Sequence, residues 1–507
     1  MNRLKLEDII NGIKAKIDTL DTNIDIYETG KVETVADGIC NVLGLSDAIY
    51  GEVIVFENKQ RGLIVELLED NVKVAILNSD PKIISGMIAY RTKQILKVKV
   101  GPAMLGRVVN AFGDPIDGKG DINTDLEQVV MAESPQIIDR KKVSEPLYTG
   151  VKMIDALIPI GYGQRELILG DRRTGKTTIA IGTILNQKEN YQKGKPVYCV
   201  YVFIGKKASD AAKLAKYLEE QDAMKYTTFV IASADDPAVF QYLAPYVGTA
   251  IAEYYRDNGE HALIIYDDLS KHAIAYREIS LLLKRFPGRE AYPGDIFFLH
   301  SSLLERSACM SDEKGGGSLT ALPIIETLEG DISSYISTNV ISITDGQIFM
   351  DKNLFLYGQR PAINTNISVS RVGGSAQTQA MRKVSGMLKL ELAQYAELKE
   401  FSRFLTDIDE TTEKALRRGE AVTRILRQGA NQLYSFEDEI LVIFGCNLGC
   451  FDNYPIDKLQ EAEKQFLSQF RKENFSILDK LIKTKVIDEE IDSTVKKFVK
   501  KFKEQSI

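Results

Sequence analysis

The sequence predicts a multidomain α/β protein with an N-terminal β-barrel, a central domain built on a mostly parallel sheet, and a C-terminal helical bundle. Three patterns indicate this order: short strands near the N-terminus, apolar strands alternating with helices in the middle, and helical periodicity from about residue 375 onward. A chain of 507 residues is long enough for several such domains. We place the boundaries at residues 1–23, 24–95, 96–375 and 376–507, and the first of these parts is a single helix.

The N-terminal region combines this helix with a run of short strands. Between residues 4 and 20 one helical face carries the apolar residues Leu6, Ile9, Ile10, Ile13, Ile17 and Leu20. Two interpretations stay open, since the helix can pack on its own domain or dock on another chain. The strand-like runs "GEVIVF", "RGLIVELLE" and "NVKVAIL" follow, separated by turn residues. A small β-barrel is the natural closure for strands of this length.

The central region alternates apolar strands with helices. The predicted strands are "ELILG", "VYCVYVFIG", "TTFVIASA", "ALIIYDD", "DIFFLH" and "SLTALPIIE", and a segment such as "DAAKLAKYLEEQDAM" has helical periodicity. This alternation predicts a parallel sheet covered by helices on both faces. Helical periodicity then takes over, with one stripe formed by Met381, Val384, Leu388, Leu392, Tyr395 and Leu398. The basic tail "STVKKFVKKFKEQ" is expected to be a surface helix and not a membrane anchor.

Composition restricts the partners. The formal net charge is −7, which argues against nucleic acid as the main partner because phosphate backbones require a basic surface. The five cysteines are sparse and favour free thiols in a reducing compartment, and Cys446 with Cys450 has no second ligand pair for zinc. No apolar run reaches the roughly 18 residues that a membrane span needs. We therefore expect membrane contact only through partner proteins.

A phosphate-binding loop is the clearest motif. The stretch "GDRRTGKTT" matches G-x-x-x-x-G-K-[ST], and it follows the strand "RELIL" and opens the helix "TTIAIGTILNQ". Glycines let backbone N–H groups converge on phosphate oxygens, and the helix N-terminus favours negative charge. Lys176 is expected to reach the outer phosphates, and the Thr177 hydroxyl to ligate Mg²⁺. The nucleotide-binding residues predicted here are Gly170, Asp171, Arg172, Arg173, Thr174, Gly175, Lys176, Thr177 and Thr178.

A carboxylate at the end of another strand is predicted to complete the metal site. "ALIIYDD" reads as a buried strand that ends in Asp267 and Asp268. A carboxylate at the C-terminal end of such a strand, across the sheet from the phosphate loop, suits a Mg²⁺-bound water. The alternative is an exposed acidic turn. We assign Asp267 to the nucleotide site and, through water, to the metal, so the predicted cofactor is Mg-ATP or Mg-ADP.

Several long motifs resemble one family. "GDRRTGKTTIAIGTILNQ", "ALIIYDDLSK", "PGREAYPGD", "GGGSLTALPIIET", "RPAINTNISVSRVG" and "LKLELAQYAEL" closely resemble alpha subunits of rotary proton-translocating ATP synthases, in matching order from about residue 25 to 450. The resemblance implies a RecA-like P-loop NTPase as the central domain. It also implies three copies alternating with three beta subunits around a gamma shaft, with a delta-type peripheral-stalk subunit at the N-terminus. The complex would lie on the inner face of a coupling membrane, either bacterial or mitochondrial, with a thylakoid membrane less expected.

One departure from the family decides between holding and cutting nucleotide. In the catalytic beta subunits of the family a glutamate positions the attacking water; alpha subunits usually carry glutamine there, and the matching residue in "YVFIGKKASD" is Lys206. An ammonium beside a triphosphate keeps its proton and cannot act as a base. We therefore expect this site to hold nucleotide without turning it over. Lys206 either tightens anion binding or points its stem into solvent, and Arg173, where the family commonly has glutamine, either touches the nucleotide or lies on the outer face of the loop.

The resemblance also assigns a catalytic arginine and a base pocket. Arg371, at the end of "NISVSRVGG", matches the arginine finger that reaches the γ-phosphate in the adjacent beta subunit. The alternative is a structural arginine paired with a carboxylate. The adenine pocket carries over to Phe355, Arg360, Pro361 and Gln428, whereas a second glutamine of the family is Ala430 in this sequence.

Three other functions remain as alternatives at this stage. A related rotary or secretion ATPase subunit would favour a carboxylate at position 206. A hexameric nucleic-acid motor would need a basic channel with stacking aromatic residues, and the acidic balance and absence of tryptophan oppose it. A scaffold that keeps nucleotide only for structure differs from an alpha subunit in the role of Arg371.

Overall fold

The computed structural model describes residues 28–36, 38–78, 82–402, 409–430, 432–452 and 454–505. The predicted N-terminal helix at residues 1–23 lies outside this part of the chain. The described residues belong to two compact units, one ending at Leu96 and the other beginning at Lys97. Within the described ranges, no helix combines the length and the apolar character needed to cross a bilayer.

The first unit is a closed barrel of six antiparallel strands in the order β1-β2-β5-β4-β3-β6. Its strands are β1 (Thr29–Ala36), β2 (Ile39–Gly44), β3 (Glu52–Phe56), β4 (Arg61–Leu67), β5 (Asn71–Ile76) and β6 (Ile88–Ile95). These strands place apolar side chains such as Val42, Ile54, Ile64 and Val74 in one buried core. The predicted barrel is confirmed.

The second unit contains an eight-stranded sheet in the order β16-β15-β10-β14-β13-β11-β12-β8. All neighbouring strands are parallel except β15 and β16, so the prediction of a mostly parallel sheet is confirmed. The strands are β8 (Val108–Asn110), β10 (Leu167–Gly170), β11 (Val197–Lys206), β12 (Thr227–Ser233), β13 (His261–Asp267), β14 (Ser318–Glu326), β15 (Gly346–Met350) and β16 (Val369–Ser370). A separate ribbon pairs β7 (Lys97–Lys99) with β9 (Glu127–Val129).

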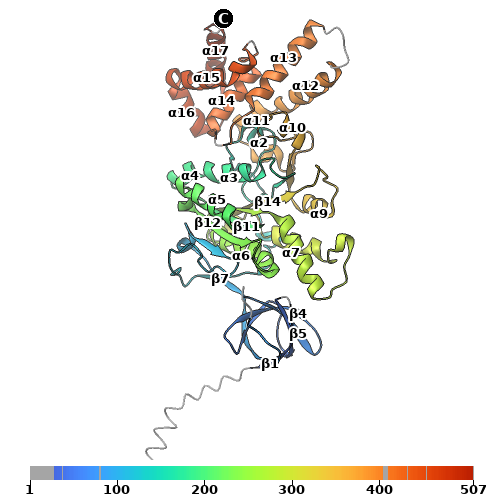
Figure 1. Cartoon of the computed structure of the whole chain (residues 1–507). Coiled ribbons are helices and arrows are strands. Elements are labelled where there is room, and N and C mark those ends of the chain that lie inside the picture. Colours follow the sequence, from blue (N-terminus) through green and yellow to red (C-terminus); the bar gives the residue numbers. More distant parts are fainter. Residues whose placement is uncertain are drawn as a thin grey trace, which may run out of the picture. The chain divides into compact units, whose positions relative to one another are not determined.

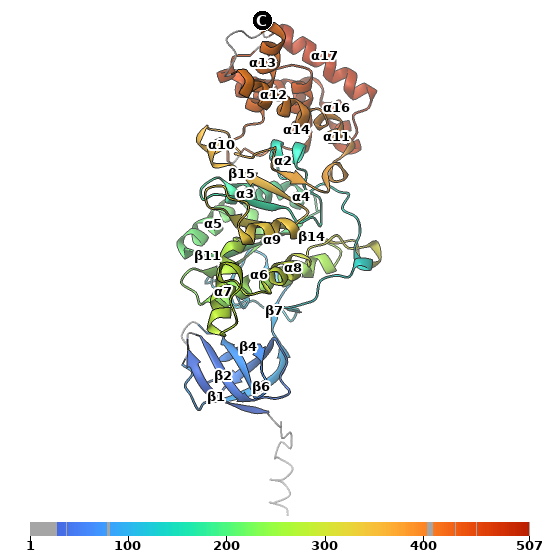
Figure 2. The same cartoon turned by 90° about the vertical axis from the view of Figure 1, so that its right-hand side faces the viewer.

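Helices connect these strands and pack against the sheet (Figures 1 and 2). Helix α6 contacts β11, β12 and β13, while α7 contacts β14 and α3 contacts β10. Because these helices cover the sheet, the strands in its middle are buried, and their sequences are almost continuously apolar. The helices of this region are α2 (Lys152–Leu157), α3 (Lys176–Asn186), α4 (Lys188–Gln192), α5 (Ala208–Glu220), α6 (Ala238–Asp257), α7 (Leu269–Leu282), α8 (Ile296–Leu304), α9 (Tyr335–Ile343) and α10 (Lys352–Leu356).

One predicted strand is wrong. The run "DIFFLH" belongs to helix α8, which spans Ile296–Leu304. The buried positions are Ile296, Leu299, His300, Leu303 and Leu304, which repeat with helical spacing, while Phe297 and Phe298 between them are exposed. A short apolar run fits a buried strand and a buried helix equally well until the residues beyond it are counted.

The C-terminal part of the second unit is helical, as predicted. Its helices are α11 (Gln379–Ser385), α12 (Leu388–Ser402), α13 (Glu410–Ile425), α14 (Phe436–Asn447), α15 (Leu459–Glu473), α16 (Phe475–Thr484) and α17 (Glu489–Gln505). The predicted stripe from Met381 to Leu398 divides between α11 and α12. On α17 the apolar residues Val495, Phe498, Val499 and Phe502 are buried in the core, so the tail helix packs on its own domain.

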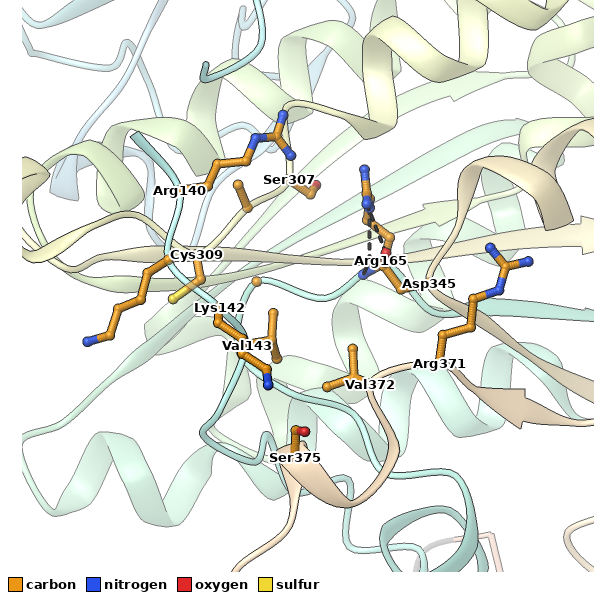
Figure 3. Close-up of a pocket in the computed structure, with 13 residues that line it drawn as sticks. Arg140, Lys142, Val143, Arg165, Ser307, Cys309, Asp345, Arg371, Val372 and Ser375 are labelled. Atoms are coloured by element: carbon orange, nitrogen blue, oxygen red, sulfur yellow. Dashed lines mark hydrogen bonds and ion pairs between the residues drawn. The ribbon is translucent and has the colours of Figure 1, made fainter. Parts of the chain in front are cut away.

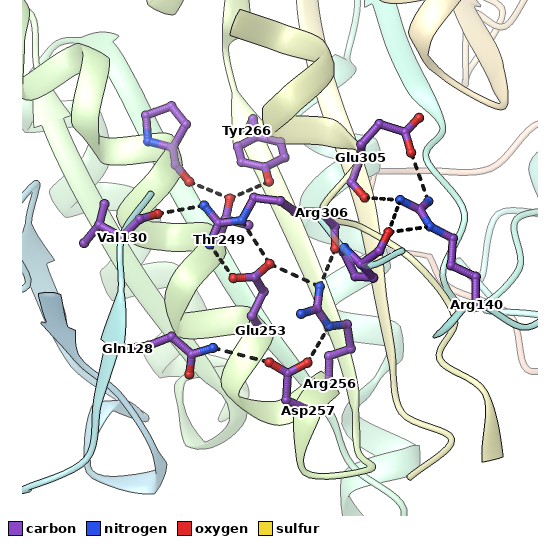
Figure 4. Close-up of polar contacts among 12 residues, drawn as sticks. Gln128, Val130, Arg140, Thr249, Glu253, Arg256, Asp257, Tyr266, Glu305 and Arg306 are labelled. Carbon is purple, nitrogen blue, oxygen red and sulfur yellow. Dashed lines mark hydrogen bonds and ion pairs between the residues drawn. The ribbon is translucent and has the colours of Figure 1, made fainter. Parts of the chain in front are cut away.

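A buried ion network connects α6 to neighbouring segments of the sheet domain (Figure 4). Glu253 on α6 and Arg306, just after α8, form a two-bonded pair, with Nε and Oε1 2.9 Å apart and both side chains about 1% exposed. Arg306 also donates to the Val130 carbonyl at 2.7 Å, and Arg256 contacts the same Glu253 oxygen at 3.1 Å. One carboxylate thus serves two buried cations, which joins α6 to two loops.

A second buried pair connects the sheet domain to the C-terminal helices. The Nζ atom of Lys152, the first residue of α2, lies 2.5 Å from Oε1 of Glu463 on α15. The same Nζ donates to the Ile425 carbonyl and lies 4.3 Å from the centre of the Tyr434 ring. Because a buried ammonium is stable only when its donors are satisfied, this cluster fixes α2 against the helical part.

Candidate functional site

The phosphate loop runs from the end of β10 to the start of α3. Gly170 ends the strand, and a Cβ atom there would lie 2.4 Å from the Met350 carbonyl oxygen, so only glycine fits. Gly175 has φ 103°, in the left-handed region that favours glycine, and Lys176 begins the helix directly after it. The loop therefore presents its backbone N–H groups at the N-terminus of α3, which is the arrangement predicted for phosphate binding.

Lys176 and Thr177 lie where the motif predicts them. The Lys176 Nζ atom donates to the carbonyls of Gly170 and Asp171, at 2.5 and 2.6 Å, in its own loop. Burial lowers the pKa of Lys176, and the nearby Lys206 ammonium lowers it further. The Thr177 hydroxyl donates to Oδ2 of Asp267 at 3.1 Å, so the loop and the predicted metal-side carboxylate meet.

Three further loop residues differ in what their side chains do. Asp171 is buried and accepts a 2.7 Å bond from the Thr327 hydroxyl, so it holds the loop against the segment after β14. Arg172 forms an ion pair with Glu326 at the end of β14. Arg173 is exposed, and its φ is 62°. The side chains of Asp171 and Arg172 are thus engaged by other residues of the chain.

A cavity of about 320 Å³ opens beside the loop and has the size of a small-ligand site. It is bordered by residues from the loop and by all four residues of the predicted base pocket, namely Thr174, Gly175, Thr178, Phe355, Arg360, Pro361 and Gln428. The Arg360 guanidinium lies over the Phe355 ring, 3.5 Å from its centre. The structure thus brings segments that are far apart in the sequence, the loop at 174–178, residues 355–361 and Gln428, together in one pocket.

Gln428 borders the cavity without offering a free amide donor. Its Nε2 atom donates to the carbonyls of Gly150 and Gln432, at 2.9 and 2.8 Å. Its Oε1 atom accepts from the backbone N–H of Lys152 at 2.9 Å. The resemblance predicts a base-contacting glutamine, and here both amide hydrogens already bind the backbone, which makes Gln428 a wall of the pocket.

Lys206 and Asp267 meet at the ends of two neighbouring strands. Strands β11 and β13 are paired so that Phe203 lies opposite Asp267, and Lys206 follows at the end of β11. Its ammonium forms an ion pair with Oδ1 of Asp267 and lies 3.8 Å from the carboxylate of Asp268. The Lys206 side chain is 28% exposed and Asp267 only 1%. Of the two alternatives for Lys206, the one in which its stem points into solvent is therefore wrong.

Gly205 explains why Lys206 turns inward. The register of β11 shifts between Ile204 and Lys206, and Gly205 has φ 61°. A Cβ atom at this glycine would lie 2.7 Å from the Gln241 amide oxygen and 2.8 Å from Cβ of Lys271. The bulge therefore requires glycine, and it directs the next side chain towards β13.

The residues present do not fit a resident Mg²⁺ beside Asp267. A threonine hydroxyl and a carboxylate are suitable ligand types for this ion. However, Oδ1 of Asp267 is taken by the Lys206 ammonium, and Oδ2 accepts from both Thr177 and Tyr201. Tyr201 was missed at the level of sequence; the available signal was a hydroxyl in an otherwise apolar buried strand, which needs a partner.

Arg371 lies at the edge of a separate cleft of about 390 Å³ (Figure 3). It directly follows β16, and its backbone N–H donates to the Asp345 carbonyl at 2.8 Å. Its guanidinium is exposed and donates to the Ile341 carbonyl at 3.2 Å. The Asp345 carboxylate instead binds Arg165, at 2.8 and 3.0 Å. Among the described residues no carboxylate pairs with Arg371, which disfavours a purely structural arginine.

Comparison with known proteins gives the family. The nucleotide-binding domain of the ATP synthase alpha/beta family matches residues 150–370, its C-terminal domain matches 377–502, and its beta-barrel domain matches 26–93. The chain belongs to the ATP synthase alpha/beta family. ATP synthase subunit alpha from Helicobacter pylori (strain Shi470) and that from Helicobacter acinonychis (strain Sheeba) are each 49% identical to it over 503 residues, 99% of either chain. The resemblance to alpha subunits predicted from the sequence is confirmed.

The family domains divide the site between them. The phosphate loop, Asp267 and the Phe355 to Pro361 wall lie in the part that matches the nucleotide-binding domain, whereas Gln428 lies in the part that matches the C-terminal domain. In this family member the cavity is therefore built by two domains of one chain. Arg371 follows the last residue matched by the nucleotide-binding domain.

Proposed function

We propose that this chain is the non-catalytic, regulatory alpha subunit of a proton-translocating ATP synthase, a complex that makes ATP from ADP and phosphate with a proton gradient. The chain holds ATP between its phosphate loop and the cavity beside it, without turnover. It supplies Arg371 to the catalytic site of the adjacent beta subunit. Similarity to two ATP synthase alpha subunits over nearly the whole chain supports this proposal, as does the geometry of the loop.

Four carboxylates around the phosphate loop are engaged by protein donors, which supports holding nucleotide without hydrolysing it. Hydrolysis needs a carboxylate that is free to orient and deprotonate water. The acidic residues around the loop each have a protein donor already: Asp171 with Thr327, Asp267 with Lys206, Asp268 with the backbone N–H of Lys271, and Glu326 with Arg172. Burial raises the pKa of Asp268 to about 6, but its carboxylate caps α7 and is 2% exposed. This engagement is the observation on which the proposal depends.

Lys176 is expected to contribute directly to ATP binding. Replacing it with alanine should weaken ATP binding to the purified chain by about tenfold or more, because a charge-assisted contact to the outer phosphates is lost. Equilibrium binding of labelled ATP measures this effect. Lys193→Ala is the matched control, since Lys193 is an exposed lysine paired with Glu189 on α4. Both variants and the original chain should show negligible hydrolysis.

The same substitution separates regulation from chemistry in the assembled complex. Lys176→Ala should leave the initial rate of ATP hydrolysis nearly unchanged and cause progressive inactivation, because nucleotide in this site biases the neighbouring beta site. A fall of several orders of magnitude in the initial rate would show that the site is catalytic. Steady turnover by the isolated chain, abolished by Lys176→Ala, would contradict the proposal as well.

The proposed partners follow from the alpha-subunit assignment. Three copies alternate with three beta subunits around a gamma shaft, and residues 1–23 dock on a delta-type peripheral-stalk subunit. The complex is peripheral on the inner face of a coupling membrane, and this chain reaches the membrane only through its partners. The division into residues 1–23, 24–95, 96–375 and 376–507 belongs to the same proposal. Copurification with beta and gamma subunits tests it.

A further inference from the structure

The cation beside Asp267 is a side chain of the protein itself. The Lys206 ammonium contacts Oδ1 of Asp267, while Thr177 and Tyr201 donate to Oδ2. A Mg²⁺ ion held through water would need that water to donate to the same carboxylate. Lys206 already makes this donation, so Asp267 has no need of a metal-bound water.

Lys206 is also held in place by the backbone. Lys206 is the last residue of β11, and the bulge at Gly205 directs its side chain towards β13. Gln241 and Lys271 leave no room for a Cβ atom at position 205, so the bulge is tightly enclosed. A divalent ion at the carboxylate would have to displace the Lys206 ammonium, whose carboxylate partners in the described part of the chain are Asp267 and, at 3.8 Å, Asp268.

Two lysine ammonium groups lie near the phosphate loop, together with the carboxylates of Asp267 and Asp268. Lys176 lies in the loop, and Lys206 approaches from β11 across the carboxylate of Asp267. A Mg²⁺ ion at the Asp267 carboxylate would lie close to the Lys206 ammonium, and two like charges a few ångströms apart repel each other.

We propose that Lys206 replaces Mg²⁺ as the cation of this site, so that the site binds metal-free nucleoside triphosphate at least as readily as the magnesium complex. This inference rests on the proposed function, because it assumes that the loop holds nucleotide. It departs from the Mg-ATP or Mg-ADP predicted from the sequence, and it makes Lys206 the residue that sets the metal requirement.

The test compares ATP binding to the full-length chain in excess EDTA and in excess MgCl₂. For the original chain the two dissociation constants should agree within about threefold. Lys206→Gln removes the ammonium and keeps a polar side chain of similar length. It should weaken metal-free binding by about tenfold or more and change Mg-ATP binding much less. Lys207→Gln makes the same chemical change at the next, exposed position and should keep the original pattern.

The original chain alone already allows the inference to fail. A loss of about tenfold or more in ATP affinity on adding EDTA would overturn it. A second measurement uses Mn²⁺ as a paramagnetic substitute, followed by electron paramagnetic resonance. The complex of chain and ATP should bind Mn²⁺ no more tightly than free ATP does, and tighter binding would overturn the inference. ATP binding in neither buffer would instead contradict the proposed nucleotide site itself.

Discussion

Replacing Arg371 with alanine or lysine should lower the multi-site ATP turnover of the assembled complex by about 10²-fold or more. Among the described residues the exposed guanidinium donates to one carbonyl, that of Ile341, so its other donors are available to a nucleotide bound by a neighbouring subunit. Lysine keeps the charge but loses the planar fork that binds two phosphate oxygens, and the defect should remain large. A factor of 10² corresponds to about 2.7 kcal/mol of transition-state stabilisation.

Two measurements on the same mutant complex distinguish a finger from a scaffold residue. Binding of ADP at the beta site should change little, because that binding depends on the beta subunit's own phosphate loop. Trapping of ADP-fluoroaluminate should fall sharply, because the arginine acts as charge develops. Lys142→Ala is a suitable control, since Lys142 borders the same cleft. Near-normal turnover and trapping in an intact Arg371→Ala complex would favour the scaffold function.

Removing Glu253 should destabilise the chain more than removing Arg306. Glu253→Ala leaves two buried guanidinium groups, Arg256 and Arg306, without their shared carboxylate. Arg306→Ala leaves the carboxylate with Arg256 as a remaining partner, 3.1 Å away. Breaking a buried pair costs about 3–5 kcal/mol, and we expect Glu253→Ala at the upper end and Arg306→Ala at the lower end.

Urea unfolding followed by circular dichroism measures both losses as shifts in the transition midpoint. The control is Arg417→Ala, which breaks an exposed pair with Glu413 in which the two side chains are 71% and 53% exposed. Such pairs contribute at most about 1 kcal/mol. Equal losses for Glu253→Ala and Arg306→Ala, or a loss at Arg417 as large as either, would contradict the interpretation of the buried network.

The fold was predictable where a periodic pattern extends over a whole element. Alternation in "NVKVAIL" and strand-like runs separated by turn residues identified barrel strands, and continuous apolar runs identified strands such as β11 and β13. Residues 295–300 were assigned wrongly because six residues are too few to separate a buried strand from a buried helix. The single stripe from Met381 to Leu398 likewise concealed the break between α11 and α12, which depends on packing and not on hydrophobic period.

The site was predictable where its residues are neighbours in sequence. The loop from Gly170 to Thr178 carries its own geometry, because the glycines and the helix start belong to one short segment. The partners of Lys206 and Gln428 were not predictable, since their contacts join positions 61 and 276 residues apart. Only the fold brings Lys206 to Asp267. It also places the Gln428 amide where it donates to the backbone carbonyls of Gly150 and Gln432.

The two buried contacts of Lys152 link helix α15 to the wall of the cavity. The Lys152 side chain is anchored to Glu463 on α15, and its backbone N–H to Gln428 at the wall of the cavity. A force that tilts α15 is therefore transmitted through α2 to the cavity wall, because neither anchor can yield without leaving a buried polar group unpaired. We therefore expect the cavity wall at Gln428 and helix α15 to move together. A hinge within this unit is then expected outside the segments that Lys152 joins. Each tilt of α15 is expected to change the width of the cavity.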